Sequence, residues 1–585
     1  MWTQDYRDKF WQQTGTEWDI LIIGGGITGA GILREASRLG LRGLLVEQND
    51  FAWGTSSRSS KLVHGGLRYL KQGRIDLILA SVQARQQLLH EGPGLIDPLG
   101  FLMSVYKGDF PGRWSFEVGL TVYDLLALRW DHAHYSPQDF EMLAPHISRQ
   151  NLEAGFRYGD AQTDDARLVL RLLQEAQEAG ASAINYTKAE RLVLEGGSVT
   201  GIEIKDQLKE QQAIVRARAV INATGAWVDQ LRAQVQGEAR IRPLRGSHLI
   251  FPSWKLPVAQ AISFLHPFDN RPVMIFPWEG ITLVGTTDVD HNGDLNQEPC
   301  ISPEETAYLM GAVESEFPSL GLRLEDVIST YAGVRPVIGT GKADPSQEGR
   351  EYMLWEESGM LTVTGGKLTT FRGIALQVLE ALRSRFPHLP HPDAKTPVLN
   401  PVDIALPAGL VLEESTRRRL LGRYGSATPL LLAAAQLGEL KPIAGTLFLW
   451  AELRWAARAE AVAHLDDLML RRTRLGLLLP KGGQAILTEV GRICQTELGW
   501  GEQRWETEAA AYLDLCRHTY SLPPLESIPD WKAQLSQARQ RRQTKLLAQQ
   551  RIYRRVKRSG VLAGLLGIGL LIAYILHRRK KATPA

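Results

Sequence analysis

Three closely spaced glycines and one acidic residue near the N-terminus could bind a dinucleotide. Gly24, Gly26 and Gly29 fit the pattern G-x-G-x-x-G and follow a short apolar run that predicts a buried strand. A helical pattern follows the glycines, a second strand is expected at 43–46, and Glu47 comes directly after it. The glycines let a pyrophosphate approach the backbone at a helix N-terminus, and the carboxylate can accept hydrogen bonds from a ribose. The glycines alone are a weak signal, but these elements in this order predict a dinucleotide site.

Two later segments favour FAD as the dinucleotide. The segment AVINATGAW, residues 219–227, predicts a strand that runs into a turn, which suits the adenine half of a flavin cofactor. In the second segment a strand meets Gly365 and Gly366 and a helical pattern begins. The positive end of that helix could stabilise reduced flavin. Either segment alone could equally be an ordinary strand-turn-helix connection.

Nine sequence blocks resemble those of the FAD-dependent, quinone-linked glycerol-3-phosphate dehydrogenases. The first eight span about residues 18–380 in the family's order, and the ninth falls in the family's C-terminal helical domain. The blocks are LIIGGGITGAGI, TSSRSSKLVHGGLRYL, DDARLVL, NATGAWV, RGSH, VGTTDVD, YAGVRPVI, GGKLTT and DDLMLRRTRLGLL. The resemblance implies oxidation of sn-glycerol 3-phosphate to dihydroxyacetone phosphate by hydride transfer to FAD N5, with electrons passed to a membrane quinone.

The resemblance also assigns residues to a non-covalent FAD site. Most of them stand in the glycine-rich blocks and at the ends of the expected parallel strands. The residues expected to bind FAD are Gly24, Gly25, Gly26, Ile27, Thr28, Gly29, Glu47, Ser56, Ser57, Lys61, His64, Gly65, Ala223, Thr224, Gly225, Gly366, Lys367, Leu368 and Thr369.

Arginines are expected to recognise the phosphate of the substrate. Arg68 and Arg335 match arginines that line the family's active site, and a planar guanidinium can bond two phosphate oxygens at once. Tyr69 could add a hydroxyl, and Arg350 is a weaker match. Together with His248, these residues are expected to bind the substrate.

The reaction needs a base for the C2 hydroxyl proton while hydride leaves C2. His64 and His248 both stand in matching blocks, and a histidine titrates near neutral pH. His248 lies nearer the expected substrate domain, whereas His64 could instead contact FAD, and the sequence does not choose between them. Arg335 and Lys367 complete the expected catalytic group, because a cation near the flavin stabilises its reduced form.

The elements that position these residues predict an α/β (α+β) fold. We expect a Rossmann-like FAD-binding domain of the glutathione-reductase/D-amino-acid-oxidase type, an antiparallel-sheet substrate domain, a C-terminal helical domain and a C-terminal transmembrane helix. The expected ranges are 18–90, 150–235 and 325–390 for the discontinuous FAD-binding domain, 91–149 and 236–324 for the substrate domain, 400–525 for the helical accessory domain, 530–558 for a basic linker or surface helix, and 559–576 for the transmembrane helix.

The stretch SGVLAGLLGIGLLIAYIL, residues 559–576, carries no charged side chain. As a helix it would span about 27 Å, near the thickness of a bilayer core. Basic clusters on both sides suit lipid headgroups, whereas a buried core helix, the alternative, would not need them. Gly560 and Gly564 would allow close helix pairing, so a homodimer is possible. Because no secretory signal opens the chain, we expect a single-pass membrane anchor with the catalytic body in the cytoplasm.

Composition argues against several other classes of protein. The 585 residues are 44% hydrophobic and 22% charged, as in ordinary globular proteins. The net charge of +3 comes from the tail, since nine Lys and Arg follow residue 550 and the rest of the chain carries −6, so nucleic-acid binding has little support. Three cysteines without CxxC spacing argue against a disulfide scaffold or a zinc site. The stretch from Asp288 to Gly293 begins like a calcium loop, but Pro299 stands where a bidentate Glu is required, so we expect no metal.

Three alternatives remain open from the sequence. A glycerol-3-phosphate oxidase would carry similar motifs but pass electrons to oxygen, and the apolar tail favours a membrane-dissolved acceptor instead. An amino-acid oxidase of the same broad fold would select a carboxylate and an amine rather than a phosphate. A non-enzymatic flavoprotein scaffold or sensor would bind FAD without reacting with any polyol phosphate.

Overall fold

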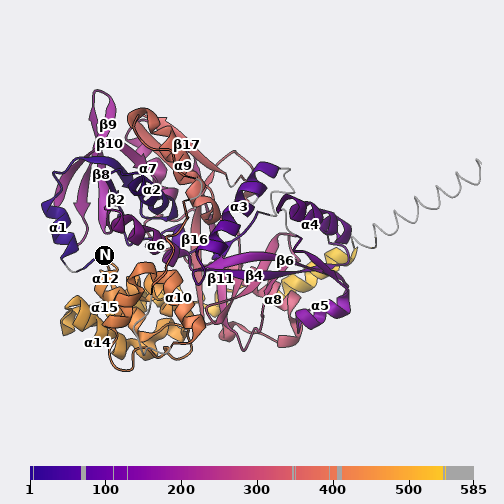
Figure 1. Cartoon of the computed structure of the whole chain (residues 1–585). Helices are drawn as coiled ribbons and strands as arrows, with labels where there is room; N and C mark the ends of the chain where they lie inside the picture. The colour runs from indigo at the N-terminus through magenta and orange to yellow at the C-terminus, as the bar shows by residue number, and fades with distance from the viewer. Residues whose placement is uncertain are drawn as a thin grey trace, which may run out of the picture.

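Two β-sheets and a C-terminal group of helices make up the described part of the chain (Figure 1). The computed structural model describes residues 1–544 and 547, apart from 4, 67–73, 110, 128–129, 346–347, 350, 394–395 and 405–411. The two sheets lie side by side, and the C-terminal helices pack beside the first sheet (Figure 1).

The first sheet has eight strands and includes the strands before and after the N-terminal glycine turn. Its main strand order is β17-β18-β10-β1-β2-β7, and β8 and β9 extend it from β10 as antiparallel neighbours. The strands β18, β10, β1, β2 and β7 run parallel to one another. The strands of this sheet are β1 (Trp18–Ile23), β2 (Gly43–Val46), β7 (Ser182–Ile184), β8 (Thr187–Glu195), β9 (Ser198–Asp206), β10 (Gln212–Asn222), β17 (Tyr352–Glu357) and β18 (Met360–Gly365).

The central strands of this sheet are apolar on both faces because helices cover one face and β8, β9 and α1 cover the other. The sequences WDILII of β1 and GLLV of β2 are almost wholly buried, as parallel strands usually are. Helix α2 (Ile27–Arg38) packs against α6 (Asp165–Glu178) and α9 (Phe371–Ala381). The contact with α9 requires Gly31, since a Cβ there would lie 2.8 Å from the ring of Phe371. This packing fixes the N-terminus of α2 at the carboxyl ends of the strands.

The second sheet has ten strands, and most neighbours in it are antiparallel. Its main order is β15-β11-β14-β13-β12-β4-β6-β3, with β16 paired to β11 and β5 paired to β6. The strands of this sheet are β3 (Leu62–Val63), β4 (Ile96–Tyr106), β5 (Ala133–Tyr135), β6 (Leu152–Thr163), β11 (Ile241–Pro252), β12 (Ala261–Leu265), β13 (Pro272–Trp278), β14 (Ile281–Gly285), β15 (Val289–Asp290) and β16 (Ser329–Ile338).

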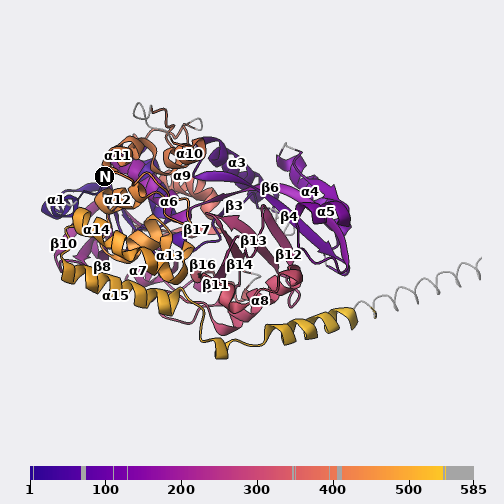
Figure 2. The same cartoon turned by 90° about the horizontal axis from the view of Figure 1, so that it is seen from below.

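Of the remaining helices, α1 and α7 pack on the first sheet, and the others cover the second sheet or form the C-terminal group (Figure 1). Their bounds are α1 (Tyr6–Gln12), α3 (Ile75–Glu91), α4 (Arg113–Ala127), α5 (Pro137–Leu143), α7 (Val228–Ala233), α8 (Pro303–Glu316), α10 (Glu414–Tyr424), α11 (Thr428–Ala434), α12 (Trp450–Ala459), α13 (Leu475–Leu478), α14 (Leu487–Leu498) and α15 (Glu502–Thr519). Residues 531–544 are also helical and run beyond α15, past α8 (Figure 2).

Buried ion pairs join the C-terminal helices to the first sheet and its helices. Arg472 bonds both carboxylate oxygens of Asp50, at 2.6 and 2.7 Å. Arg474 donates to Asp164 at 2.8 Å and also pairs with Asp165. Loss of one partner would leave a buried charge unpaired, which destabilises a protein strongly. The blocks DDARLVL and DDLMLRRTRLGLL therefore hold the two parts of the chain together next to the glycine-rich turn.

The domain ranges given above stay a prediction. Strands β6 and β16 lie within ranges predicted for the FAD-binding domain. In the structure, however, both strands belong to the ten-stranded sheet. The second sheet therefore draws strands from both sides of those boundaries.

The structure does not support the predicted C-terminal transmembrane helix. It also does not support the predicted membrane localisation through a single-pass anchor. Among the helices of the described residues, none combines the length and the apolar character needed to cross a bilayer. Helix α15 and the helical stretch 531–544 carry charged side chains along their length, which a bilayer core disfavours. The segment 559–576, with Gly560 and Gly564 on which the homodimer rested, lies outside the described residues. The fold class that stands is α/β with a helical C-terminal domain.

Candidate active site

A cavity of about 1560 Å³ lies where the two sheets meet. Its walls come from the carboxyl ends of β1, β2, β10 and β18 in the first sheet and from β4, β6, β13 and β16 in the second. Small-ligand pockets usually measure about 300–1000 Å³. This cavity therefore has room for a dinucleotide and a second small molecule.

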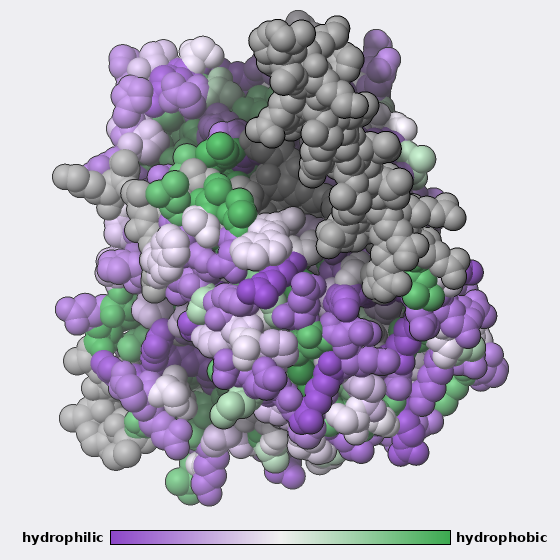
Figure 3. All heavy atoms as spheres, turned by 90° about the vertical axis from the view of Figure 1, so that its right-hand side faces the viewer, coloured by the Kyte–Doolittle hydropathy of each residue, from purple (hydrophilic) through white to green (hydrophobic). Residues whose placement is uncertain are grey.

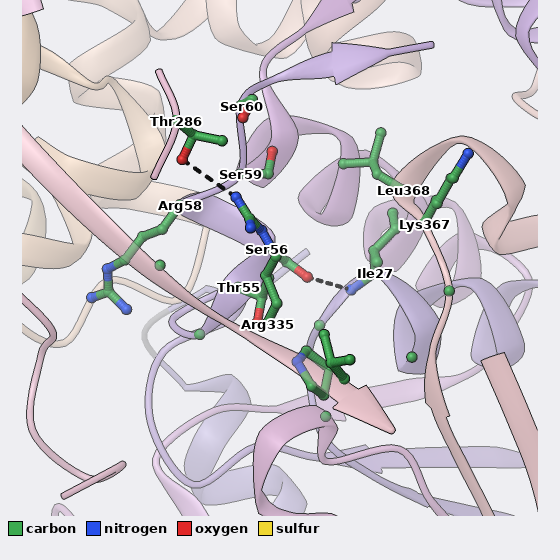
Figure 4. A pocket seen from close by; sticks show the side chains of 18 of the residues that line it. Ile27, Thr55, Ser56, Arg58, Ser59, Ser60, Thr286, Arg335, Lys367 and Leu368 are labelled. Atoms are coloured by element: carbon green, nitrogen blue, oxygen red, sulfur yellow. Dashed lines mark hydrogen bonds between the residues drawn. The ribbon is translucent and has the colours of Figure 1, made fainter. Parts of the chain in front are cut away.

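The glycine turn between β1 and α2 forms one end of the cavity. Gly24 has φ +114°, and a Cβ there would lie 2.6 Å from the carbonyl oxygen of Ala223. A Cβ on Gly29 would lie 2.0 Å from the Gly24 carbonyl oxygen, so the close approach of turn and helix requires glycine. The Ile27 amide donates to Ser56 Oγ at 2.9 Å (Figure 4). The first turn of α2 thus directs backbone amides at the cavity, which suits an anion such as a pyrophosphate.

The carboxylate of Glu47 is held beside this turn at the end of β2. Its Oε2 accepts from the Gly25 amide at 2.6 Å and its Oε1 accepts from the Asn49 amide at 2.9 Å. Burial raises the pKa of Glu47, while the hydrogen bonds from these two amides act in the opposite direction. The two bonds fix the orientation of a carboxylate that lines the cavity, as recognition of a ribose would require.

Arg335 on β16 lies on the wall contributed by the second sheet. Its Nη1 donates to Asp288 Oδ1 at 2.9 Å and its Nη2 donates to Thr286 Oγ1 at 3.3 Å (Figure 4). Arg271 approaches the same carboxylate, with 3.5 Å between Nη2 and Asp288 Oδ2. On the neighbouring strand β11, a Cβ on Gly246 would lie 2.3 Å from Arg335 Nη2, so glycine makes room for the guanidinium. A guanidinium oriented in this way is suited to bind a phosphate or a carboxylate.

His64 also lines the cavity, on the turn that follows β3. The next residue is anchored: the Gly65 amide donates to Asp160 Oδ1 at 2.9 Å, and Arg85 Nη1 donates to the same oxygen at 2.9 Å. Burial raises the pKa of Asp160, whereas the charges of Arg85 and Lys367 lower it. The buried Asp160–Arg85 pair therefore fixes the backbone that carries His64.

His248, the other predicted base, is enclosed behind the cavity wall. Its side chain is 1% exposed, and its ring stacks on Tyr331 with 4.4 Å between ring centroids and 10° between ring planes. Its Nε2 lies 2.9 Å from Ser60 Oγ, and Ser60 lines the cavity. Burial, with the charges of Arg335 and Lys61 in the same direction, lowers the pKa of His248 well below its usual value. Burial and the two cations therefore disfavour the charged form of the ring.

Lys61 is fully buried on the far side of the same segment. Its ammonium donates to Asp165 Oδ1 and to the Ser57 carbonyl, each at 2.9 Å. The same group lies 5.0 Å from the ring centroids of Trp278 and Tyr331. Burial lowers the pKa of Lys61 to about 8. Lys61 thus supports the segment that carries Ser60 from behind.

The chain as a whole matches families of known enzymes. Residues 19–372, more than half of the chain, match the family described as FAD dependent oxidoreductase. The chain belongs to the FAD-dependent oxidoreductase family. Residues 394–505 match the family described as C-terminal domain of alpha-glycerophosphate oxidase, in agreement with the helical C-terminal group.

Comparison with individual proteins shows which members of the family this chain is similar to. The aerobic glycerol-3-phosphate dehydrogenase of Staphylococcus epidermidis is 35% identical over 486 residues, which cover 78% of this chain and 87% of the relative. The structure of glycerol-3-phosphate dehydrogenase from Bacillus halodurans complexed with FAD superposes with a TM-score of 0.70 at 28% identity, covering 88% of this chain and 98% of that one. The L-alpha-glycerophosphate oxidase of Mycoplasma pneumoniae with FAD bound shares the fold, with a TM-score of 0.54 at 18% identity, over 67% of this chain and 100% of that one. The predicted resemblance to FAD-dependent glycerol-3-phosphate dehydrogenases is confirmed.

The residues of this FAD-dependent oxidoreductase fit the cofactor. The glycine turn would offer helix-terminal amides to the pyrophosphate, and the Glu47 carboxylate beside it would accept hydrogen bonds from a ribose. At the carboxyl end of β18, Gly366, Lys367 and Leu368 line the cavity just before α9. A lysine and a helix N-terminus there would favour negative charge on the flavin ring. The prediction that the enzyme uses FAD is confirmed.

The structure brings most of the predicted site residues to one cavity. Those that line it are Gly24, Gly26, Ile27, Thr28, Glu47, Ser56, His64, Ala223, Thr224, Gly225, Arg335, Gly366, Lys367 and Leu368. The predicted residues that the structure describes but that do not line it are Gly25, Gly29, Ser57, Lys61, Gly65, His248 and Thr369. Arg68, Tyr69 and Arg350 lie outside the described residues. The individual roles stay predictions.

Several residues that line the cavity were not predicted as site residues. Among them are Ser60, Thr286, Asp288, Arg271 and Asp160. Asp288 belongs to the block VGTTDVD and was considered only as the start of a calcium loop, whereas its carboxylate in fact pairs with two arginines. Its position in this matching block was the signal that could have identified Asp288 as a site residue. Asp160 and Arg271 lie outside the matching blocks, so the sequence alone offered no signal for them.

Proposed function

We propose that this enzyme oxidises sn-glycerol 3-phosphate to dihydroxyacetone phosphate and passes the electrons to a quinone. The observation that carries the proposal is the presence of the oriented Arg335 guanidinium in the same cavity as the glycine turn and Lys367. The names of the relatives agree with a phosphorylated alcohol as substrate. A phosphate of nearly two negative charges needs cations, which Arg335, Arg271 and Lys367 supply.

Arg335 binds the phosphate in this account and keeps its orientation through Asp288. Because Asp288 is 5% exposed and bonded to Arg335 at 2.9 Å, the guanidinium is positioned before the substrate arrives. Such preorganisation lowers the entropic cost of binding. When bound, FAD supplies the hydride acceptor for C2 of the substrate.

His64 is the side chain that we assign as base for the C2 hydroxyl. It lines the cavity, and Asp160 fixes the backbone of its neighbour Gly65. His248 is a poorer candidate, because its ring is buried and it forms its hydrogen bond to Ser60 rather than facing the cavity. A general base must come within hydrogen-bond reach of the proton that it removes.

An apolar part of the cavity favours a quinone over a small polar acceptor. Phe101, Met103, Phe116 and Leu120 line it, the last two from the inner side of α4 (Arg113–Ala127). On its outer side the same helix exposes Trp114 by 74%, among other apolar residues, and hydrophobic side chains gather on this face of the molecule (Figure 3). Apolar surface on both sides of α4 offers an apolar acceptor a favourable route toward the cavity. Oxygen, the second candidate acceptor, would not need such a wall.

The test compares products and acceptors with the FAD-loaded full chain. With glycerol 3-phosphate and a soluble quinone analogue under nitrogen, we expect dihydroxyacetone phosphate and quinol in equal amounts. In air without quinone, hydrogen peroxide should form much more slowly. Peroxide formation at the rate of substrate turnover, with no quinone reduction, would identify an oxidase. Oxidation of an amino acid in place of glycerol 3-phosphate would overturn the substrate assignment.

A further inference from the structure

We infer that the Ser60 hydroxyl binds a phosphate oxygen of the substrate and that His248 is a positioning residue, which acts only through Ser60. This inference rests on the proposed function and deepens it. It concerns a pair of side chains 188 residues apart in sequence, of which one lines the cavity and the other is buried behind it.

The first step is that His248 has no room to reach the cavity itself. One face of its ring stacks on Tyr331, with 4.4 Å between centroids. Its edge lies against β14, where a Cβ on Gly285 would come within 2.1 Å of His248 Cδ2. The ring is therefore packed against one face and one edge in a well-filled core, and among the described residues its Nε2 forms a hydrogen bond with Ser60 Oγ, at 2.9 Å.

The second step assigns the proton on the ring. His248 Nδ1 is buried and has no hydrogen-bond partner among the described residues. A buried N–H without an acceptor costs more than a bare nitrogen lone pair, so we place the proton on Nε2. Nε2–H then donates to Ser60 Oγ. The cations Arg335 and Lys61 near the ring, together with its burial, oppose a second proton, and they lower the pKa of His248.

The third step follows from the direction of that hydrogen bond. Since Ser60 Oγ accepts from His248, the hydroxyl hydrogen can turn toward the cavity and donate to a ligand oxygen. Ser60 and Thr286 lie on the same side of the cavity as the Arg335 guanidinium, opposite Lys367 and Leu368 (Figure 4). A second donor beside an arginine suits an anion with several oxygens, which in the proposed substrate is the phosphate.

The experiment compares Ser60→Ala with Ser60→Thr in the FAD-loaded full chain. Loss of one hydrogen bond to a charged group should raise KM for glycerol 3-phosphate about tenfold to a hundredfold in S60A. The inhibition constant of inorganic phosphate should rise by a similar factor. The rate of flavin reduction at saturating substrate should change by less than about threefold, and S60T should restore most of the affinity, because it keeps the hydroxyl.

The second pair of variants is His248→Phe and His248→Gln. Phenylalanine keeps the stacking on Tyr331 but removes the donor, so H248F should raise KM as S60A does, and the double variant should add little more. Glutamine can place an N–H near the Nε2 position and should behave more like the native chain.

Two results would overturn the inference while leaving the proposed function intact. The first is an S60A variant whose KM and phosphate inhibition constant match the native chain while glycerol 3-phosphate still reduces its flavin. The second is a fall of a hundredfold or more in flavin reduction at saturating substrate in both H248F and H248Q, as expected for a catalytic base. If glycerol 3-phosphate fails to reduce the flavin of the native chain, the proposed function itself fails.

Discussion

Replacement of Arg335 by lysine tests the phosphate site most sharply. The guanidinium bonds Asp288 at 2.9 Å through one nitrogen and Thr286 at 3.3 Å through the other. A lysine ammonium keeps the positive charge but lacks the planar fork, so it cannot maintain both hydrogen bonds and also present two donors to a phosphate. The variant should therefore bind FAD normally and bind glycerol 3-phosphate poorly.

The expected rise in KM follows from the hydrogen bond that this substitution removes. A hydrogen bond to a charged group contributes about 1.5–3 kcal/mol, and the variant should form about one such bond fewer to the phosphate. A loss of about 2 kcal/mol corresponds to roughly a thirtyfold rise in KM, at 1.36 kcal/mol for each factor of ten. Asp288, which is 5% exposed, keeps the more distant Arg271 at 3.5 Å, so we expect the variant to fold.

Steady-state kinetics with the quinone analogue would measure the effect, with FAD content checked from the absorbance spectrum. The matched control is Arg242→Lys, because Arg242 also pairs with an aspartate, Asp290 at 2.6 Å, but does not line the cavity. KM should change less than twofold in this control. An unchanged KM in R335K, with R242K equally unchanged, would refute the assignment of Arg335 to the phosphate.

Three further substitutions test other parts of the account. Glu47→Gln should weaken FAD binding about tenfold, measured by fluorescence of released FAD, because an amide cannot accept from two backbone N–H groups and a ribose as a carboxylate can; unchanged affinity would contradict its role. Asp160→Asn should lower stability by about 3 kcal/mol in urea unfolding, because Arg85 loses its buried partner, and should slow flavin reduction; native stability and rate would argue against it. Burial raises the pKa of Glu316 to about 8, so the folded chain holds a proton that the unfolded chain releases above its usual pKa. The free energy of unfolding should therefore fall as pH rises from about 5 to 8, and Glu316→Gln should flatten this slope in thermal unfolding; equal slopes would contradict it.

The dinucleotide half of the site could be predicted because its geometry is local in sequence. The glycine turn, the helix that follows it and Glu47 at the end of the next strand lie within thirty residues of one another, and each has a recognisable residue type. The requirement for glycine is steric: a Cβ at Gly29 would lie 2.0 Å from a backbone oxygen. Short-range constraints of this kind leave a pattern that a single sequence displays.

The substrate half could be predicted only in part, because its contacts join distant segments. His248 stands in a matching block, but whether its ring faces the cavity depends on Tyr331 and Gly285, which belong to other strands. Lys61 was expected to bind the cofactor because it also stands in a matching block. Its ammonium instead donates a hydrogen bond to Asp165, 104 residues later in the sequence. Residue type and position in a motif do not determine the direction in which a side chain points.

The predictions for the C-terminal part of the chain had different outcomes. An uncharged run of suitable length between basic clusters predicted a membrane-spanning helix, and that prediction did not stand. By contrast, the helical character expected for the C-terminal domain agrees with the structure, because α10, α12, α14 and α15 carry apolar residues at helical spacing.

The central claim is that one cavity holds FAD beside a site for a phosphorylated alcohol. The most direct test is to add glycerol 3-phosphate to the FAD-loaded full chain in the absence of oxygen and to follow the visible absorbance of the flavin. We predict rapid loss of that absorbance, with recovery on addition of a quinone analogue. Persistence of the oxidised spectrum at saturating glycerol 3-phosphate, in protein that contains FAD, would contradict the account.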